Sequence, residues 1–156
     1  MKKIFLFIIL ILFVAHATTA FIFEEEVLKV AQEIGSPIIF DFVNYGKPNS
    51  VGGVNLNLYY KNVSDKTFKY VYISVIPYNA VDDVVICEIR RNSIFNGRVT
   101  GPSEPGKESG YIHFENAWYN HGIRSIEIIM ISVDFMDGST WKTEDKEIIK
   151  SLIARP

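Results

Sequence analysis

The sequence has 156 residues and a nearly balanced charge, with 16 Lys and Arg against 18 Asp and Glu. Because no basic run or stripe interrupts this balance, a nucleic acid is not expected as a partner. Cys87 is the only cysteine, which excludes a disulfide bond within the chain.

Residues 1–20 have the pattern of a secretory signal peptide. Lys2 and Lys3 precede an unbroken apolar run over Ile4–Val14, and small residues follow it. As a helix this run would cross only about half of a ~30 Å hydrocarbon core, which favours a cleaved signal over a membrane anchor. Cleavage after Ala17 or Ala20 leaves the same domain. We therefore expect an exported protein, periplasmic or secreted, with no stable membrane span after cleavage.

Residues 21–35 are predicted to form an amphipathic helix. Glutamates in its first turn suit the helix dipole, and Gly35 and Pro37 end it. Its apolar side chains recur at helical spacing, at Phe23, Val27, Val30, Ala31 and Ile34.

Residues 36–142 are predicted to form a β-sandwich domain, because the hydrophobic period changes from helical to two. Six segments have the pattern of strands, and no helix alternates with them, so two packed antiparallel sheets are favoured over a parallel sheet. The segments are 37–45, 54–62, 67–78, 84–90, 111–120 and 125–135.

The segment 84–90 contains Cys87, which alternates with Val85 and Ile89 on an apolar face. This pattern favours a buried, unreactive thiol over a reactive one or an intermolecular disulfide. The following segment 96–110 is rich in Gly and Pro and is predicted to be a long loop.

Residues 143–156 are predicted to form a short C-terminal helical tail. Thr143 is the expected N-cap. An apolar stripe follows at Ile148, Ile149, Leu152 and Ile153.

The tripeptide Ile-Ser-Val occurs twice, starting at Ile73 and Ile131, in two equivalent strand patterns. Each copy has apolar residues at i, i+3, i+5 and i+7, which requires a bulge or bend after the first of them. The predicted core face of the first copy is Val71, Ile73 and Val75. The residues predicted to point outward are Tyr70, Tyr72, Ser74 and Ile76 in the first copy, and Ile128, Met130, Ser132 and Asp134 in the second.

The segment from Pro48 to Val85, followed by Thr-Gly-Pro, Trp-Tyr-Asn and Met-Asp-Gly-Ser, resembles a small domain of exported bacterial proteins of unknown function. It is also loosely similar to the FxLYD type of extracytoplasmic domain. The resemblance covers about Ser36 to Trp141 and implies an immunoglobulin-like β-sandwich, but no catalytic residues. One departure is Asp82, where the family pattern has Gly, which questions a positive φ at that turn.

Five aromatic residues are candidates for a binding surface, because amphipathic rings are frequent at interfaces and can stack on sugars. The alternative is that the apolar faces of the two terminal helices cover them. They are Tyr59, Tyr70, Tyr72, Trp118 and Tyr119.

Residues for metal binding or catalysis are few. His113 and His121 have no second His or Cys at ligand spacing. Asp134 and Asp137, with the Asp82-Asp83 pair, are candidates for a calcium site only if their loops meet at one end. No cofactor is expected.

These observations favour a non-enzymatic interaction or ligand-binding domain of the bacterial cell envelope, with an envelope protein or a glycan as partner. The alternative is a metal-dependent envelope enzyme or a calcium-stabilised adhesion module that uses His121, Asp134 and Asp137.

Overall fold

The computed structural model describes residues 25–155, so the predicted signal segment 1–20 lies outside the described residues. Residues 25–34 are helical, and the elements that follow are β1 (Ile38–Tyr45), β2 (Gly53–Asn62), β3 (Phe68–Tyr78), β4 (Phe95–Ser103), β5 (Ile112–Tyr119), β6 (Ser125–Phe135), β7 (Thr140–Thr143), α2 (Lys146–Ser151) and β8 (Ile153–Arg155).

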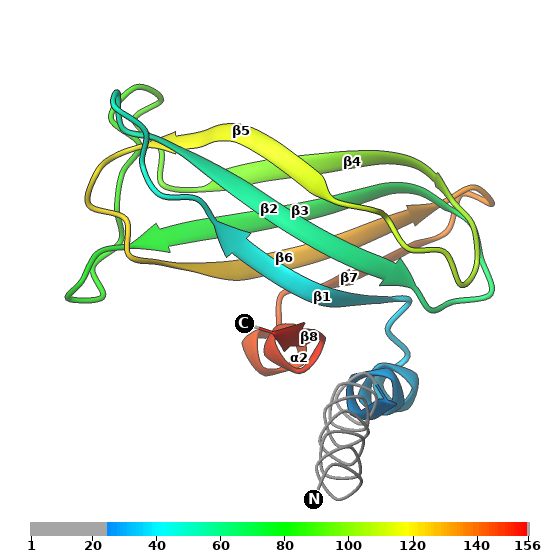
Figure 1. Ribbon diagram of the computed structural model, residues 1–156. Coiled ribbons are helices and arrows are strands. Elements are labelled where there is room, and N and C mark those ends of the chain that lie inside the picture. The colour runs from blue at the N-terminus through cyan, green and yellow to red at the C-terminus, as the bar shows by residue number, and fades with distance from the viewer. Residues whose placement is uncertain (1–24, 156) are drawn as a thin grey trace, which may run out of the picture.

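The strands form two four-stranded sheets that pack face to face (Figure 1). One has the order β5-β2-β1-β8 and the other β4-β3-β6-β7. Every strand pair is antiparallel except β1 with the short β8. This is the order A-B-E opposite C′-C-F-G of immunoglobulin-like sandwiches, with β8 added beside the first strand. The predicted fold class is confirmed.

The two Ile-Ser-Val copies lie side by side on β3 and β6, where Ile73 is directly opposite Ile131. Both side chains are fully buried, as are Val71, Val75 and Val133. The predicted core face of the first copy is therefore correct. The repeat marks the two central strands of one sheet, each of which needs an aliphatic inner face.

The predicted bulge is present in both copies, but at different places. In β3 the register shifts between Phe68 and Tyr70, as expected. In β6 it shifts later, since Val75 pairs with Ile128 and Ser74 with Met130, which leaves Ile129 as the extra residue. Ile128 is therefore buried, at 5% exposure, and its predicted outward position was wrong.

The predicted strand over residues 84–90 is absent, because this segment bonds to two different sheets. The Val85 N–H donates to the Pro77 carbonyl, next to the end of β3, whereas the Glu88 N–H donates to the Tyr119 carbonyl of β5. Cys87 is buried as predicted, but Ile89 is 65% exposed. The alternating sequence of residues 84–90 therefore does not form a strand, because its hydrogen bonds are divided between two sheets.

The predicted loop over residues 96–110 was also partly wrong, because β4 occupies its first half. β4 is an edge strand, where Pro102 removes no hydrogen bond that the sheet needs. Gly101 allows a close approach to β3, since a Cβ atom there would lie 2.4 Å from the Phe68 carbonyl oxygen.

The N-terminal helix buries Val27 and Ala31 and ends at Gly35, whose φ is +68°. This agrees with the prediction over the described residues. Asp82 also adopts a positive φ of 61°, so the turn keeps the expected backbone without Gly. Asp tolerates this conformation better than most residues.

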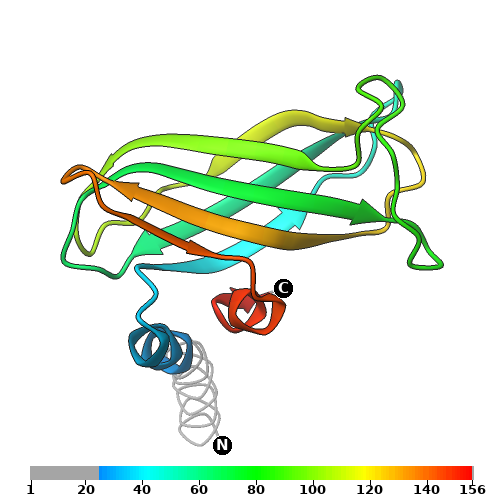
Figure 2. The ribbon, with the colours of Figure 1, turned by 180° about the vertical axis from the view of Figure 1, so that it is seen from behind.

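The C-terminal tail differs from the prediction. Its N-cap is Asp145, which accepts bonds from the N–H groups of Glu147 and Ile148, whereas Thr143 is the last residue of β7. Ile153 leaves the helix and joins β8 beside β1. Both helices lie along one edge of the sandwich (Figures 1 and 2). Among residues 25–155, none of the helices has the length and apolar character that crossing a bilayer requires.

We predict that Ile131→Ala destabilises the domain by about 2–5 kcal/mol, because it opens a cavity between the sheets. The matched change on the other face of the strand, Met130→Ala, is expected to cost less than about 1 kcal/mol. Urea unfolding of both variants measures the difference. Equal losses would contradict the assignment of faces on β6.

Candidate functional site

The predicted aromatic surface is divided between the two sheets. Tyr70 and Tyr72 lie on β3, whereas Tyr59 lies on β2 in the other sheet and stacks on Phe42 with ring centroids 6.1 Å apart. Strands of opposite layers cannot present these residues on one face. The five residues therefore form no single patch.

Trp118 is a core residue, which corrects its prediction as a binding residue. It is 1% exposed, and its indole N–H donates to the Ser93 carbonyl at 2.8 Å. The reason is a bulge in β5, where Asn116 has a φ of 49° and the register with β2 shifts. Tyr119 is half-buried at the end of the same strand, and its N–H donates to the Cys87 sulfur at 3.4 Å.

Tyr70 and Tyr72 remain half-exposed on the outer face of their sheet, with ring centroids 6.0 Å apart. The Arg98 guanidinium lies 5.2 Å from the centre of the Tyr70 ring. A shallow hollow beside Tyr72 includes Met130 and Lys142. The described helices lie along the edge of the sandwich and leave this face open (Figure 2).

Asp134 and Asp137, the candidates for a calcium site, have structural roles in β6 and in the turn that follows it. Asp137 forms an ion pair with Lys66 at 2.8 Å and accepts bonds from the N–H and hydroxyl of Ser139. Lys66 and then Ser139 hold the pKa of Asp137 well below its ordinary value. Asp134 lies within the ladder, opposite Tyr70 and Thr140.

The histidines are also separate. His113 Nδ1 lies 2.6 Å from the Asn57 side-chain oxygen on β2. His121 is exposed, in the turn before β6. Within residues 25–155, no group of three His, Cys, Asp or Glu side chains is arranged to hold a metal ion.

A groove lies at the seam between the two sheets, and we call it the seam groove. Its volume is about 650 Å³, and β1, β6 and α2 form its walls. The lining residues are Val43, Asn44, Tyr45, Tyr78, Asp82, Arg124, Ser125, Ile126, Glu127, Ile128, Lys146, Ile149, Lys150 and Ile153.

The groove exists because two strands end early. β7 pairs with β6 only over Ile131–Asp134, and β8 pairs with β1 only at Phe40 and Phe42. The chain between β7 and β8 forms α2, which packs against β6 and β8. One half of the seam is therefore closed, and the other half has two strand edges without a described neighbour.

The groove has an apolar floor and a charged rim. Val43, Ile128 and Ile149 are buried at its base. The cationic side chains of the rim are Arg124, Lys146 and Lys150, and its acidic side chains are Asp82 and Glu127. Among the lining residues cations outnumber carboxylates by three to two, and Lys150 also pairs with Glu147 at 3.3 Å, next to the groove.

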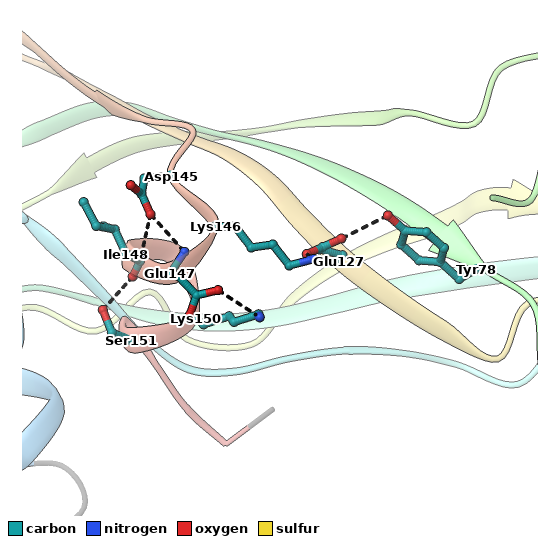
Figure 3. Close-up of polar contacts among 8 residues, drawn as sticks. All are labelled: Tyr78, Glu127, Asp145, Lys146, Glu147, Ile148, Lys150 and Ser151. Atoms are coloured by element: carbon teal, nitrogen blue, oxygen red, sulfur yellow. Dashed lines mark hydrogen bonds and ion pairs between the residues drawn. The ribbon is translucent and has the colours of Figure 1, made fainter. Parts of the chain in front are cut away.

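Glu127 is held between Lys146 of α2 and Tyr78 of β3 (Figure 3). One of its oxygens lies 2.5 Å from Lys146 Nζ, and the other accepts the Tyr78 hydroxyl at 2.9 Å. The Lys146 ammonium, more than the tyrosine, lowers the pKa of Glu127. Burial, followed by the hydrogen bond to Glu127, raises the pKa of Tyr78. The ion pair thus keeps Glu127 ionised.

Arg124 differs from the lysines because its guanidinium donates to neutral acceptors. These are the carbonyls of His121 and Ile123, at 2.9 and 2.7 Å. Within residues 25–155, no carboxylate forms an ion pair with it. Its charge is therefore available to a ligand at the mouth of the groove.

Sequence reasoning missed the seam groove, because its walls come from segments about a hundred residues apart. One local signal is Glu127, the only charged residue between Ser125 and Val133. It indicates a polar partner on that face, but the partner Lys146 lies on a helix whose start was predicted at the wrong residue.

The chain matches no protein-family model and no curated protein sequence. Three solved structures are similar at low identity. A hypothetical protein of Peptoclostridium difficile is 14% identical, with a TM-score of 0.44, over 74% of this chain and 91% of that one. IrmA of Escherichia coli is 11% identical, with a TM-score of 0.45, over 76% and 87%. A GH3 β-glucosidase of Bifidobacterium adolescentis is 16% identical, with a TM-score of 0.35, over 68% of this chain and 16% of that one. Similarity at this level carries no argument about function.

We predict that Glu127→Gln removes a pH-dependent part of the stability. Because folding lowers the pKa of Glu127 from its ordinary 4.5, its contribution is complete above that pH and is lost as the pH falls through the folded value. Urea unfolding is to be compared at about pH 7 and about pH 3. The variant should be less stable than the wild type at the higher pH, with a smaller difference at the lower one. A difference independent of pH would contradict the ion pair.

We also predict that calcium and zinc leave the unfolding temperature unchanged, because Lys66 and Ser139 already occupy the Asp137 carboxylate. A thermal-shift titration measures this. A metal that binds the folded state would raise stability by RT ln(1 + [L]/Kd). Such a rise, abolished by Asp137→Asn, would support the calcium-stabilised alternative.

Proposed function

We propose that this protein is an exported, non-enzymatic interaction domain of the bacterial cell envelope, and that it binds its partner in the seam groove. The observation that carries the proposal is the groove itself, an apolar hollow with an excess of cations where both sheets have open edges. Ligand sites commonly combine an apolar lining with a few placed polar groups.

Export is supported by the basic and apolar pattern of residues 1–20. A binding role is favoured over catalysis by the state of Glu127. General bases work best with a pKa near the operating pH, whereas Lys146 and Tyr78 move the pKa of this carboxyl further below it. The groove therefore suits recognition better than proton transfer.

The composition of the groove favours an envelope protein over a neutral glycan. Its floor is aliphatic, with Val43, Ile128 and Ile149, so it offers apolar contact and not a flat aromatic platform for a sugar ring. The unpaired charge of Arg124 favours an anionic group on the partner.

The outer face with Tyr70, Tyr72 and Arg98 is a second candidate surface. Its two neighbouring tyrosine rings, tilted by 57° to each other, and its cation are of the kind that binds glycans or proteins. Mutations on each of the two surfaces distinguish between them.

We predict that the double variant Arg124→Glu, Lys150→Glu reduces capture of the partner from envelope extracts by about tenfold or more, because it places like charges beside an anionic ligand. Quantitative pull-down with the immobilised domain measures capture. Tyr72→Glu on the outer face is the matched control and should capture normally.

Thermal unfolding of both variants shows whether they fold. Loss of capture by Tyr72→Glu alone, in a folded domain, would move the binding site to the outer face. Normal capture by both folded variants would contradict the proposed function.

A further inference from the structure

We infer that the seam groove receives an extended peptide segment of the partner, which adds as a strand along the edge of β6 beyond the end of β7 and places an acidic group at Arg124. This inference rests on the proposed function and specifies the chemistry of its ligand. It follows from the open edge of β6, the length of that edge and the charge beside it.

The main chain of β6 presents hydrogen-bonding groups to the groove. Ile126 is directly opposite Pro77, whose carbonyl accepts a bond from Val85 and so points away from β6. Opposite residues of an antiparallel pair either face each other or both face away. The N–H and C=O of Ile126 therefore face the side where β7 has ended.

The open edge has the length of an ordinary strand. β7 reaches β6 only from Ile131 onward, which leaves the edge from Ser125 to Met130. Figure 2 shows β7 ending partway along β6. At ~3.3 Å per residue this stretch is about 20 Å long, the span of a typical strand. α2 forms the wall beside part of it, and the edge lining the groove is Ser125–Ile128.

The edge has only part of the protection against strand addition that edges usually have, because α2 lies beside only part of it and the bulge at Ile129 ends its regular stretch Ser125–Ile128. Exposed edges are commonly protected by Pro, by charges or by covering segments. The edge strand β4 of the same sheet carries Pro102. The open part of β6 instead has the sequence Ser-Ile-Glu-Ile-Ile-Met, whose one charge is neutralised by Lys146. It therefore suits pairing with another chain.

β1, the wall of the groove opposite β6, and the floor between them can contact such a strand. The Gly46 N–H bonds to the Asn55 carbonyl, so Tyr45, one residue earlier, directs its main chain away from β2 and toward the groove. Val43 and Ile149 line the floor between the walls. Alternate side chains of an added strand would contact this floor, as in other strand-addition complexes.

The positive charge of Arg124 favours an acidic residue in the peptide. Arg124 lies immediately before β6, at the mouth of the groove, where its carbonyl accepts the Tyr45 hydroxyl from β1. Its guanidinium donates to the carbonyls of His121 and Ile123 and pairs with no carboxylate among the described residues. Guanidinium groups bind carboxylates in bidentate geometry. An Asp or Glu near one end of the peptide, or its C-terminal carboxylate, therefore completes the site.

The test uses a displayed library of random linear peptides, selected on the wild-type domain and counter-selected on the double variant Arg124→Glu, Lys150→Glu. The expected winners have apolar residues at every second position and a terminal acidic residue. Winners with helical spacing, or with no acidic preference, would overturn the inference.

A synthetic copy of one winner then tests the main-chain contact. N-methylation of its amides one at a time should weaken binding about tenfold at alternate positions and leave the intervening positions unchanged. Tolerance at every position would contradict strand addition. Arg124→Gln should weaken binding by about two- to fivefold, whereas the control Lys142→Gln on the outer face should not.

The outcomes separate the two proposals. If no peptide is enriched but capture of the envelope partner still depends on the groove, the peptide inference fails and the proposed function stands. If capture is also independent of the groove, both fail.

Discussion

β6 has a strand partner along its whole length on one side, where β3 lies, and only over Ile131–Asp134 on the other, and the rest of the structure depends on this asymmetry. Its pairing with β3 brings Ile73 opposite Ile131 and builds the centre of the core. Its pairing with β7 stops at Ile131. The chain then forms α2 and returns as β8, which closes the seam at the end near Phe40 and leaves the seam groove at the other end.

Patterns along single strands could be predicted from the sequence, and contacts between distant strands could not. Val71, Ile73 and Val75 face the core because period-two patterning decides orientation once one face is buried. The same reasoning misplaced Ile128 and Trp118, because bulges in β6 and β5 shift the alternation and leave no mark in composition. It also missed β4, since Pro and Gly exclude only central strands.

The candidate site shows the same limit. Glu127 is the only charged residue between Ser125 and Val133 of β6, but its role depends on Lys146 and Tyr78, which reach it from α2 and β3. The five aromatic residues that composition favoured lie on two sheets and in the core. The groove uses aliphatic residues that any sandwich would have, together with Arg124 and the two lysines, and it becomes visible only when the ends of β7 and β8 are known.

Native-state hydrogen exchange of the unliganded domain tests the open seam most directly. The Ile126 amide should exchange at least about a hundredfold faster than the Ile131 amide, because Ile131 lies between strands on both sides and Ile126 faces the groove. Equal, strong protection of the two amides would contradict an open β6 edge. That result would also contradict the assignment of the groove as the binding site of an extended peptide.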